Sequence, residues 1–330
     1  MRPGADVAID IGGTWFRVRE AGQVTRRMRT PSRLNHPAAP APELFRRLVA
    51  LILDHAPRTG RVAISLGAAT DDVAKRLIGS GPLWGDWRPV EDIQTVLESA
   101  RSDLSWFIFN DVSCALADFS TTVDPALTSH VGFLTVSSGI ALRIADLDNR
   151  IIPVDEAGMQ GEVGHLPLPV TSSTDLTTGL RCECGGRGHL ASVASGPGIR
   201  RVSERLGMDA FSIEWFIGAL DRQDERAHAI LDAATEPIAE LIRALWTTQP
   251  WIGVLGVGGG VPESIPVHYR NALRTHLAAA TGYTALSAAI WTSGLRVLSA
   301  QDHISNLRGA QLLAQGHLTI TRAKAQEYGT

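Results

Sequence analysis

The segment VAIDIGGTWFRVR, residues 7–19, decides the fold class that the sequence predicts. Residues 7–9 form a short apolar run, and Asp10 and a pair of glycines follow it. This order predicts a buried strand that enters a tight turn. From Trp15 to Arg19 the side chains alternate in character, which predicts a second strand that returns antiparallel to the first. The segment is therefore expected to be a strand, a small turn and a strand.

The turn Asp10-Ile11-Gly12-Gly13-Thr14 has the composition of a phosphate cradle. Neither glycine carries a Cβ, so backbone N–H groups can approach an anion closely. Thr14 adds a hydroxyl donor, and Asp10 can hold Mg²⁺ directly or through water because hard cations prefer oxygen ligands. An ordinary glycine-containing hairpin turn would have the same five residues, and the pentapeptide alone does not separate the two interpretations.

The strand, turn and strand arrangement recurs near residues 131–145, around the turn Ser137-Ser138-Gly139. Elsewhere, apolar runs typical of buried strands alternate with segments of helical periodicity, and a loop is expected at residues 31–42. The strand-like runs are 62–66, 106–109 and 252–257, and the helical segments include 44–52, 229–246 and 304–313. Alternating strands and helices predict an α/β protein, and the length suits two lobes. A polar tail is expected after the last helix.

Bulk properties exclude several classes of protein. The chain has 330 residues, 44% of them hydrophobic and 20% charged, with a net charge of −3. Such a balance argues against a nucleic-acid-binding surface, which normally has a basic excess. No apolar run approaches the roughly 20 residues that span a bilayer, and the N-terminus lacks a secretory signal. The three cysteines cannot form a disulfide framework, so a cytoplasmic location is expected.

Five motifs, in order along the chain, resemble those of the ROK family (repressors, open reading frames and kinases). The first is Asp10 to Thr14, which resembles the first phosphate motif of sugar kinases that share the actin, hexokinase and heat-shock ATPase fold. The other four are Asn110-Asp111, Gly161-Glu162-Val163-Gly164-His165, Cys182-Glu183-Cys184-Gly185-Gly186-Arg187-Gly188-His189 and Gly258-Gly259-Gly260. The resemblance covers nearly the whole chain.

The resemblance implies a two-lobed α/β ATPase fold, actin-like or hexokinase-like, with ribonuclease H-like domains and an interlobe cleft. Residues 1–115 and 305–330 would form the smaller lobe, and residues 116–304 the larger one. It also implies ATP and Mg²⁺ as cofactors, a small-molecule sugar or cyclitol as acceptor, and a homodimer. The reaction would be phosphorylation of a primary hydroxyl.

The resemblance also assigns roles to residues. Asp111 would be the general base, since an alcohol needs a carboxylate to accept its proton during phosphoryl transfer. A helix N-cap is a second role that Asn110-Asp111 can fill before Val112. The acceptor would contact Gly67, Asn110, Asp111, Glu162 and His165, and the nucleotide would contact Asp10, Gly12, Gly13, Thr14, Ser137, Ser138, Gly139, Gly258, Gly259 and Gly260. Trp84 and Trp87 could stack on a ring-shaped substrate, although packing is the role that we favour for them.

A structural zinc site is the last implication. His165, Cys182, Cys184 and His189 supply the nitrogen and sulfur ligands of tetrahedral Zn²⁺, and His189 stands where the family has a third cysteine. Nearby glycines permit the tight path of a metal knuckle. A Cys-x-Cys pair alone would fit two buried thiols equally well.

The sequence departs from the family at two places. The second phosphate loop lacks the family's later glycines, because Ile140-Ala141-Leu142 follows Gly139. Ala191 replaces a glutamate that accepts hydrogen bonds from the anomeric end of the sugar in the family. Because an unmatched hydroxyl in a pocket is penalised, we expect an acceptor altered at that end, an aminosugar or a C7-cyclitol.

Three other functions are consistent with parts of this pattern. A plain glucokinase-type hexose kinase is an alternative to a kinase of a modified sugar or cyclitol. A catalytically inactive sugar-binding protein would explain the two departures, although Asp10 and Asp111 argue against it. A sugar-sensing repressor would need a DNA-binding domain before the phosphate motif, which begins at residue 7.

Overall fold

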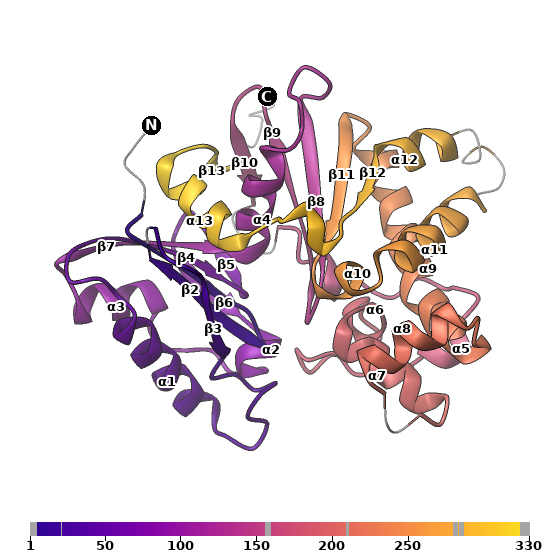
Figure 1. The fold of residues 1–330 in the computed structure, drawn as a ribbon, viewed down its shortest axis with the longest axis horizontal. Helices are drawn as coiled ribbons and strands as arrows, with labels where there is room; N and C mark the ends of the chain where they lie inside the picture. The colour runs from indigo at the N-terminus through magenta and orange to yellow at the C-terminus, as the bar shows by residue number, and fades with distance from the viewer. Residues whose placement is uncertain are drawn as a thin grey trace, which may run out of the picture. The chain divides into compact units, whose positions relative to one another are not determined.

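The structure is a computed structural model that describes residues 5–20, 22–155, 160–208, 211–279, 283 and 287–323. The chain divides into two compact units. The first unit comprises Met1–Thr122, Arg143–Gly161 and Ser305–Thr330, and the second comprises Val123–Leu142 and Glu162–Ile304. Helices and strands alternate in both units, so the predicted α/β class is confirmed (Figure 1).

The first unit is built on a five-stranded sheet in the order β3-β2-β1-β4-β7. Its strands are β1 Val7–Ile11, β2 Trp15–Glu20, β3 Arg26–Arg29, β4 Gly60–Leu66 and β7 Leu104–Asn110. β1 and β2 pair antiparallel, as the sequence predicts, and β4 and β7 run parallel to β1. A small hairpin of β5 Ala69–Asp71 and β6 Arg76–Gly79 follows β4.

Helices cover both faces of this sheet (Figure 1). α1 Ala41–Asp54 and α3 Ile93–Ala100 lie on one face, and α4 Asp111–Ser120 and α13 Asn306–Gln315 pack together on the other. The short helix α2 Gly81–Trp84 adjoins α1. The last helix, α13, therefore packs in the same unit as the first strands, although it lies near the other end of the chain.

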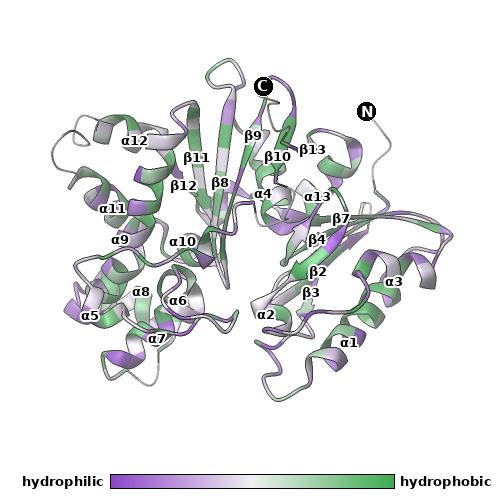
Figure 2. Cartoon of the chain, turned by 180° about the vertical axis from the view of Figure 1, so that it is seen from behind, coloured by the Kyte–Doolittle hydropathy of each residue, from purple (hydrophilic) through white to green (hydrophobic). Residues whose placement is uncertain are grey.

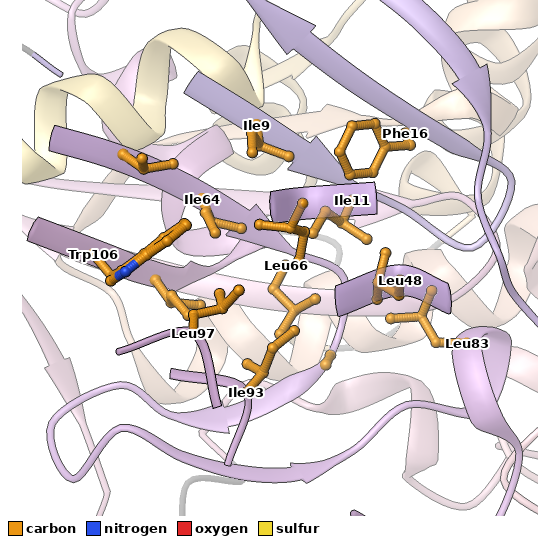
Figure 3. Packing of buried hydrophobic residues seen from close by; sticks show 14 of the residues in the cluster. Ile9, Ile11, Phe16, Leu48, Ile64, Leu66, Leu83, Ile93, Leu97 and Trp106 are labelled. Carbon is orange, nitrogen blue, oxygen red and sulfur yellow. The ribbon is translucent and has the colours of Figure 1, made fainter. Parts of the chain in front are cut away.

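A single apolar cluster fills the space between the sheet and the helices α1, α2 and α3 (Figure 3). Ile9, Ile11 and Ile64 of the strands and Leu48 of α1 all belong to this cluster, and none of them is exposed to solvent. Trp84 is also fully buried, with its ring 5.6 Å from that of Phe45 between centroids. Trp84 therefore packs in the core and does not offer its face to a substrate.

The second sheet has six strands in the order β12-β11-β8-β9-β10-β13. Its strands are β8 His130–Val136, β9 Ile140–Asp146, β10 Ile151–Val154, β11 Ile252–Gly258, β12 Leu295–Val297 and β13 Thr319–Arg322. The second predicted arrangement of a strand, a turn and a strand is thus present as β8 and β9. Residues 319–322 were expected in a polar tail but form β13, because the β-branched residues Thr319, Ile320 and Thr321 suit a strand that pairs with β10.

The described part of the second unit contains helices α5 to α12 and ends with the 3₁₀ turn η3 Ala300–Asp302. These helices are α5 Thr174–Thr177, α6 Ala191–Ala194, α7 Gly196–Arg205, α8 Ile213–Asp221, α9 Glu225–Thr248, α10 Gly260–Ser264, α11 Pro266–Ala278 and α12 Ala288–Gly294. A single 3₁₀ turn, η1 Val163–His165, precedes them. Hydrophobic residues are concentrated along the strands of both sheets, and hydrophilic ones along loops and helix surfaces (Figure 2). Across the described ranges, no helix is both long and apolar enough to traverse a bilayer.

Candidate active site

Asp10 is the most heavily hydrogen-bonded side chain of the predicted phosphate turn. The residue is 3% exposed, and its carboxylate accepts hydrogen bonds from Arg17 Nη1 at 2.7 Å, Ser65 Oγ at 2.9 Å and Asn306 Nδ2 at 3.1 Å. An ionised carboxylate offers about four lone-pair positions, so these three donors leave room for a further partner. This oxygen chemistry fits Mg²⁺ held through a water molecule.

Gly67 lies beside two other predicted site residues of the first unit, Gly12 and Asp111. Its N–H donates to the carbonyl of Ile11 at 2.7 Å, so the end of β4 lies against the phosphate turn. A Cβ at Gly67 would stand 3.3 Å from Asp111 Oδ2 and 3.4 Å from Gly12 Cα. A Cβ at Gly67 would therefore contact both the Asp111 carboxylate and Gly12, which are 99 residues apart in the chain. Glycine at position 67 leaves a gap at this meeting point that a larger residue would fill.

Asn110 is the N-cap of α4. The sequence left two roles open for Asn110-Asp111, a helix N-cap and a general base. Its Oδ1 accepts from the N–H groups of Val112 and Ser113, and its Nδ2 donates to the carbonyl of Ala68 at 2.8 Å. Asp111 is the first residue of the helix, where a negative charge is stabilised by the helix dipole. The cap is supplied by Asn110, and the Asp111 carboxylate is not needed for it.

Asp72 stabilises the same turn from the β5–β6 hairpin. Its buried carboxylate accepts from the N–H of Asn110 at 3.0 Å and from the hydroxyl of Ser113 at 3.2 Å. Thr70 donates a third hydrogen bond at 2.7 Å. The backbone at the start of α4 is thereby fixed on both sides of Asp111.

In the second unit, the glycine run Gly258 to Gly260 packs on the turn Ser137-Ser138-Gly139. Gly259 has φ +98°, and a Cβ there would approach the carbonyl of Val136 to 2.7 Å. A Cβ at Gly260 would stand 3.4 Å from Ser137 Oγ. The carbonyl of Ser137 also accepts from the N–H of Gly196, at the N-terminus of α7, at 2.8 Å. Two predicted nucleotide segments and one helix N-terminus thus meet at the end of β8.

Glu162 is the N-cap of the single turn η1 and His165 is its last residue, and the turn packs tightly on β9. A Cβ at Gly164 would lie only 2.5 Å from the carbonyl of Ile140, so only glycine permits this approach. His165 Nε2 is 4.0 Å from Glu162 Oε2. Burial lowers the pKa of His165, and the neighbouring His189 lowers it further, so the neutral imidazole is favoured at neutral pH.

The four predicted zinc ligands converge. Their ligand atoms all lie within 4.8 Å of one another. Cys182 Sγ is 3.8 Å from His165 Nδ1, and Cys184 Sγ is 3.3 Å from His189 Nδ1. Tetrahedral zinc with ordinary bond lengths separates a sulfur from a nitrogen ligand by about 3.5 Å, so the donor set and its spacing fit zinc.

The knuckle that presents these ligands is closed by backbone hydrogen bonds. The N–H of Cys182 donates to the carbonyl of Gly186 at 2.9 Å, and the N–H of Gly185 donates back to Cys182 at 3.0 Å. Burial raises the pKa of the Cys182 thiol to about 11, so a metal would have to displace its proton. Ala191, two residues past His189, begins α6 and is buried.

The predicted site residues thus fall into two groups. Asp10, Gly12, Gly13, Thr14, Gly67, Asn110 and Asp111 belong to the first unit, and the remainder belong to the second. Sequence reasoning did not find Arg17, Ser65, Asp72 or Asn306. Arg17 had a signal, because a hairpin around Gly13-Thr14 places it opposite Asp10, as the observed register does. The other three come from distant segments that only the fold brings near.

The fold and these sites define a class of protein, an α/β protein with glycine-containing turns at the ends of its strands. Its structure is similar to the crystal structure of a ROK family glucokinase from Streptomyces griseus in complex with glucose and AMPPNP. The TM-score is 0.69 and the identity is 21%, over 94% of this chain and 99% of that one. At this identity the likeness shows the fold.

The family follows from the sequence comparison. The ROK family model matches residues 6–316, so the chain belongs to the ROK family. It is 34% identical over 290 residues to a 2-epi-5-epi-valiolone 7-kinase of Actinoplanes sp., covering 81% of this chain and 80% of that protein. It is 31% identical over 289 residues to a C(7)-cyclitol 7-kinase of Streptomyces hygroscopicus subsp. jinggangensis, covering 77% and 78%.

Proposed function

We propose that this carbohydrate kinase transfers a phosphoryl group from ATP to the primary hydroxyl of a C7-cyclitol, with Asp111 as the general base. The observation that carries the proposal is the position of the Asp111 carboxylate beside Gly67, where the end of β4 lies against the phosphate turn. Asp111 follows directly after β7, and ligands of open α/β sheets bind at the carboxyl ends of strands. An acceptor can therefore bind there, next to the proposed phosphate turn. Both reactants of a phosphoryl transfer would therefore meet at Asp111.

In the proposed reaction, Asp111 accepts the proton of the acceptor hydroxyl while the hydroxyl oxygen forms a bond to the γ-phosphorus. The bond from that phosphorus to the β,γ-bridging oxygen breaks, and ADP leaves. The N–H groups around Gly12-Gly13 and the Thr14 hydroxyl would hold phosphate oxygens. Bound Mg²⁺, held by Asp10 through water, would offset phosphate charge. The segments Ser137–Gly139 and Gly258–Gly260 would contact the nucleotide from the second unit.

The acceptor would lie against Gly67 and Asn110 in the first unit and Glu162 and His165 in the second. We propose a C7-cyclitol because Ala191 offers no acceptor for an anomeric hydroxyl, which a cyclitol lacks. A 2-epi-5-epi-valiolone 7-kinase and a C(7)-cyclitol 7-kinase among the relatives support the same choice. A plain hexose would leave one hydroxyl unmatched in the pocket, which costs binding free energy.

Zinc is proposed as a structural ion on Cys182, Cys184, His189 and Nδ1 of His165. Zinc on one ring nitrogen would fix the orientation of the imidazole and so aim its other nitrogen toward the acceptor. We also propose that the two compact units act as the lobes of the kinase. A homodimer in the cytoplasm and a role in antibiotic biosynthesis remain proposals that rest on the resemblance alone.

A coupled assay of ADP release tests the proposed function. The purified protein would be given glucose, aminosugars such as kanosamine, and C7-cyclitols, with Asp111→Ala as the control. We expect the highest kcat/KM with a C7-cyclitol and no turnover above background in the variant. A clear preference for glucose would contradict the acceptor. ADP release that is equal in the variant and the wild type for every acceptor would indicate a binding protein instead.

A further inference from the structure

The segment Thr30–Asn35, which follows β3, forms hydrogen bonds to three consecutive carbonyl groups of the phosphate turn. Thr30 Oγ1 donates to the carbonyl of Gly12 at 2.7 Å, and Ser32 Oγ donates to that of Gly13 at 2.5 Å. Asn35 Nδ2 donates to the carbonyl of Thr14 at 2.9 Å. We name Thr30–Asn35 the clamp segment. All of these residues belong to the first unit.

These bonds fix the orientation of peptide groups that the backbone alone leaves free. In a planar trans peptide, the carbonyl of one residue and the N–H of the next point in opposite directions. At Gly12-Gly13 no Cβ restricts rotation of the peptide plane. A carbonyl held on the clamp side therefore turns the following N–H, of Gly13 or of Thr14, to the opposite side.

The N–H groups of Gly13 and Thr14 are the expected phosphate donors. Within the described residues, neither N–H donates a hydrogen bond to a protein atom. A backbone N–H group seldom stays unpaired unless water or a ligand accepts from it. The clamp segment thus orients two N–H groups that remain available to an anion.

The clamp segment is itself held in place. Thr30 and Ser32 are fully buried, so water cannot readily replace their hydroxyls. Asn35 Nδ2 also donates to the carbonyl of Thr30, and the N–H of Asn35 donates to Ser32 Oγ at 3.2 Å. The N–H of Arg33 donates to the carbonyl of Leu83 in α2 at 2.8 Å, which anchors the segment to the core.

We propose that Thr30, Ser32 and Asn35 are positioning residues for the phosphate donor, and that their hydrogen bonds keep the N–H groups of Gly13 and Thr14 directed at its phosphates. This inference rests on the proposed function, because it presupposes that ATP binds at Asp10 to Thr14. Ground-state binding of ATP should therefore depend on the clamp segment. Binding of the acceptor and the position of the Asp111 carboxylate should not depend on it.

Binding of ATP·Mg²⁺ without acceptor, measured by calorimetry, tests the inference together with the KM values for ATP and acceptor. Thr30→Val keeps the shape of the side chain and removes the hydroxyl, whereas Thr30→Ser keeps the hydroxyl. Ser32→Ala removes the second donor. Ser120→Ala is the matched control, because Ser120 is a buried serine of the same unit whose hydroxyl donates to a backbone carbonyl, that of Ala117.

We expect Thr30→Val and Ser32→Ala to weaken ATP binding by about three- to tenfold each, the effect of one lost hydrogen bond. Thr30→Ser and Ser120→Ala should bind as the wild type does, and the KM for the acceptor should stay constant in all four. If Thr30→Val and Ser32→Ala bind ATP as tightly as Ser120→Ala does, the inference is wrong. It is equally wrong if Thr30→Ser loses as much affinity as Thr30→Val. If the wild type itself does not bind ATP, the proposed function fails first.

Discussion

The two turns expected to hold phosphates are stabilised in different ways. The first, at Asp10 to Thr14, is held by side chains from β2, β4, α13 and the clamp segment. The second, at Ser137 to Gly139, lies against the backbone of Gly259, Gly260 and Gly196. The first should therefore be sensitive to the loss of side-chain polar groups. The second should be sensitive to a Cβ added at Gly259, which would approach the carbonyl of Val136 to 2.7 Å.

The largest effect is expected in the first unit, at Asp111. Asp111→Asn keeps the shape of the side chain and removes its ability to accept a proton. We predict a fall in kcat of about 10²- to 10⁴-fold, the usual contribution of general base catalysis. The KM for ATP should change little, because ATP would contact the neighbouring turn. The rate of ADP release measures both values, and a kcat within threefold of the wild type would contradict the assignment of Asp111 as the base.

The next effect concerns the zinc cluster of the second unit. Cys182→Ser replaces a soft thiolate by a weak ligand, so we predict loss of stoichiometric zinc and a lower melting temperature. Cys114→Ser is the control, since Cys114 is a buried cysteine of the first unit and lies outside the cluster. Elemental analysis of the purified proteins measures the zinc. Wild-type protein without zinc, or a Cys182→Ser variant that retains it, would refute the proposed site.

A smaller effect is expected at Gly259, where the comparison between the two turns is sharpest. Gly259→Ala adds a Cβ at φ +98° and only 2.7 Å from a carbonyl oxygen. We predict a rise of about tenfold in the KM for ATP, because the local strain amounts to roughly 1–3 kcal/mol. Gly207→Ala is the matched control in the same unit, since it has φ +75° but no atom within 4 Å of the added Cβ. Equal KM values for ATP in the two variants would contradict the predicted role of Gly259 at the nucleotide site.

The sequence predicts local features of this fold well. The hairpin around Gly13-Thr14, the second hairpin at Ser137–Gly139 and the convergence of Cys182 with His189 depend on short segments whose residue types limit the backbone. The β13 strand was missed because four residues are too few for a reliable pattern, and its partner β10 lies more than 160 residues earlier.

Contacts over long separations explain what else was missed at the site. Asn306 reaches Asp10 only because α13 packs beneath β1, and nothing in the spacing of either residue indicates this. The clamp segment was expected to be a plain loop, because periodicity describes strands and helices and does not describe the path of a loop. Its two hydroxyls and one amide acquire a role only when the fold places them against the phosphate turn.

The position of the transferred phosphate tests the central claim most directly. The product made from a C7-cyclitol and ATP would be analysed by proton–phosphorus correlation NMR. Phosphorylation of the primary hydroxyl predicts that phosphorus couples to the two protons of an exocyclic methylene group. Coupling to a single ring proton would contradict the proposed acceptor position. Inorganic phosphate as the sole phosphorylated product besides ADP would contradict the proposed transfer itself.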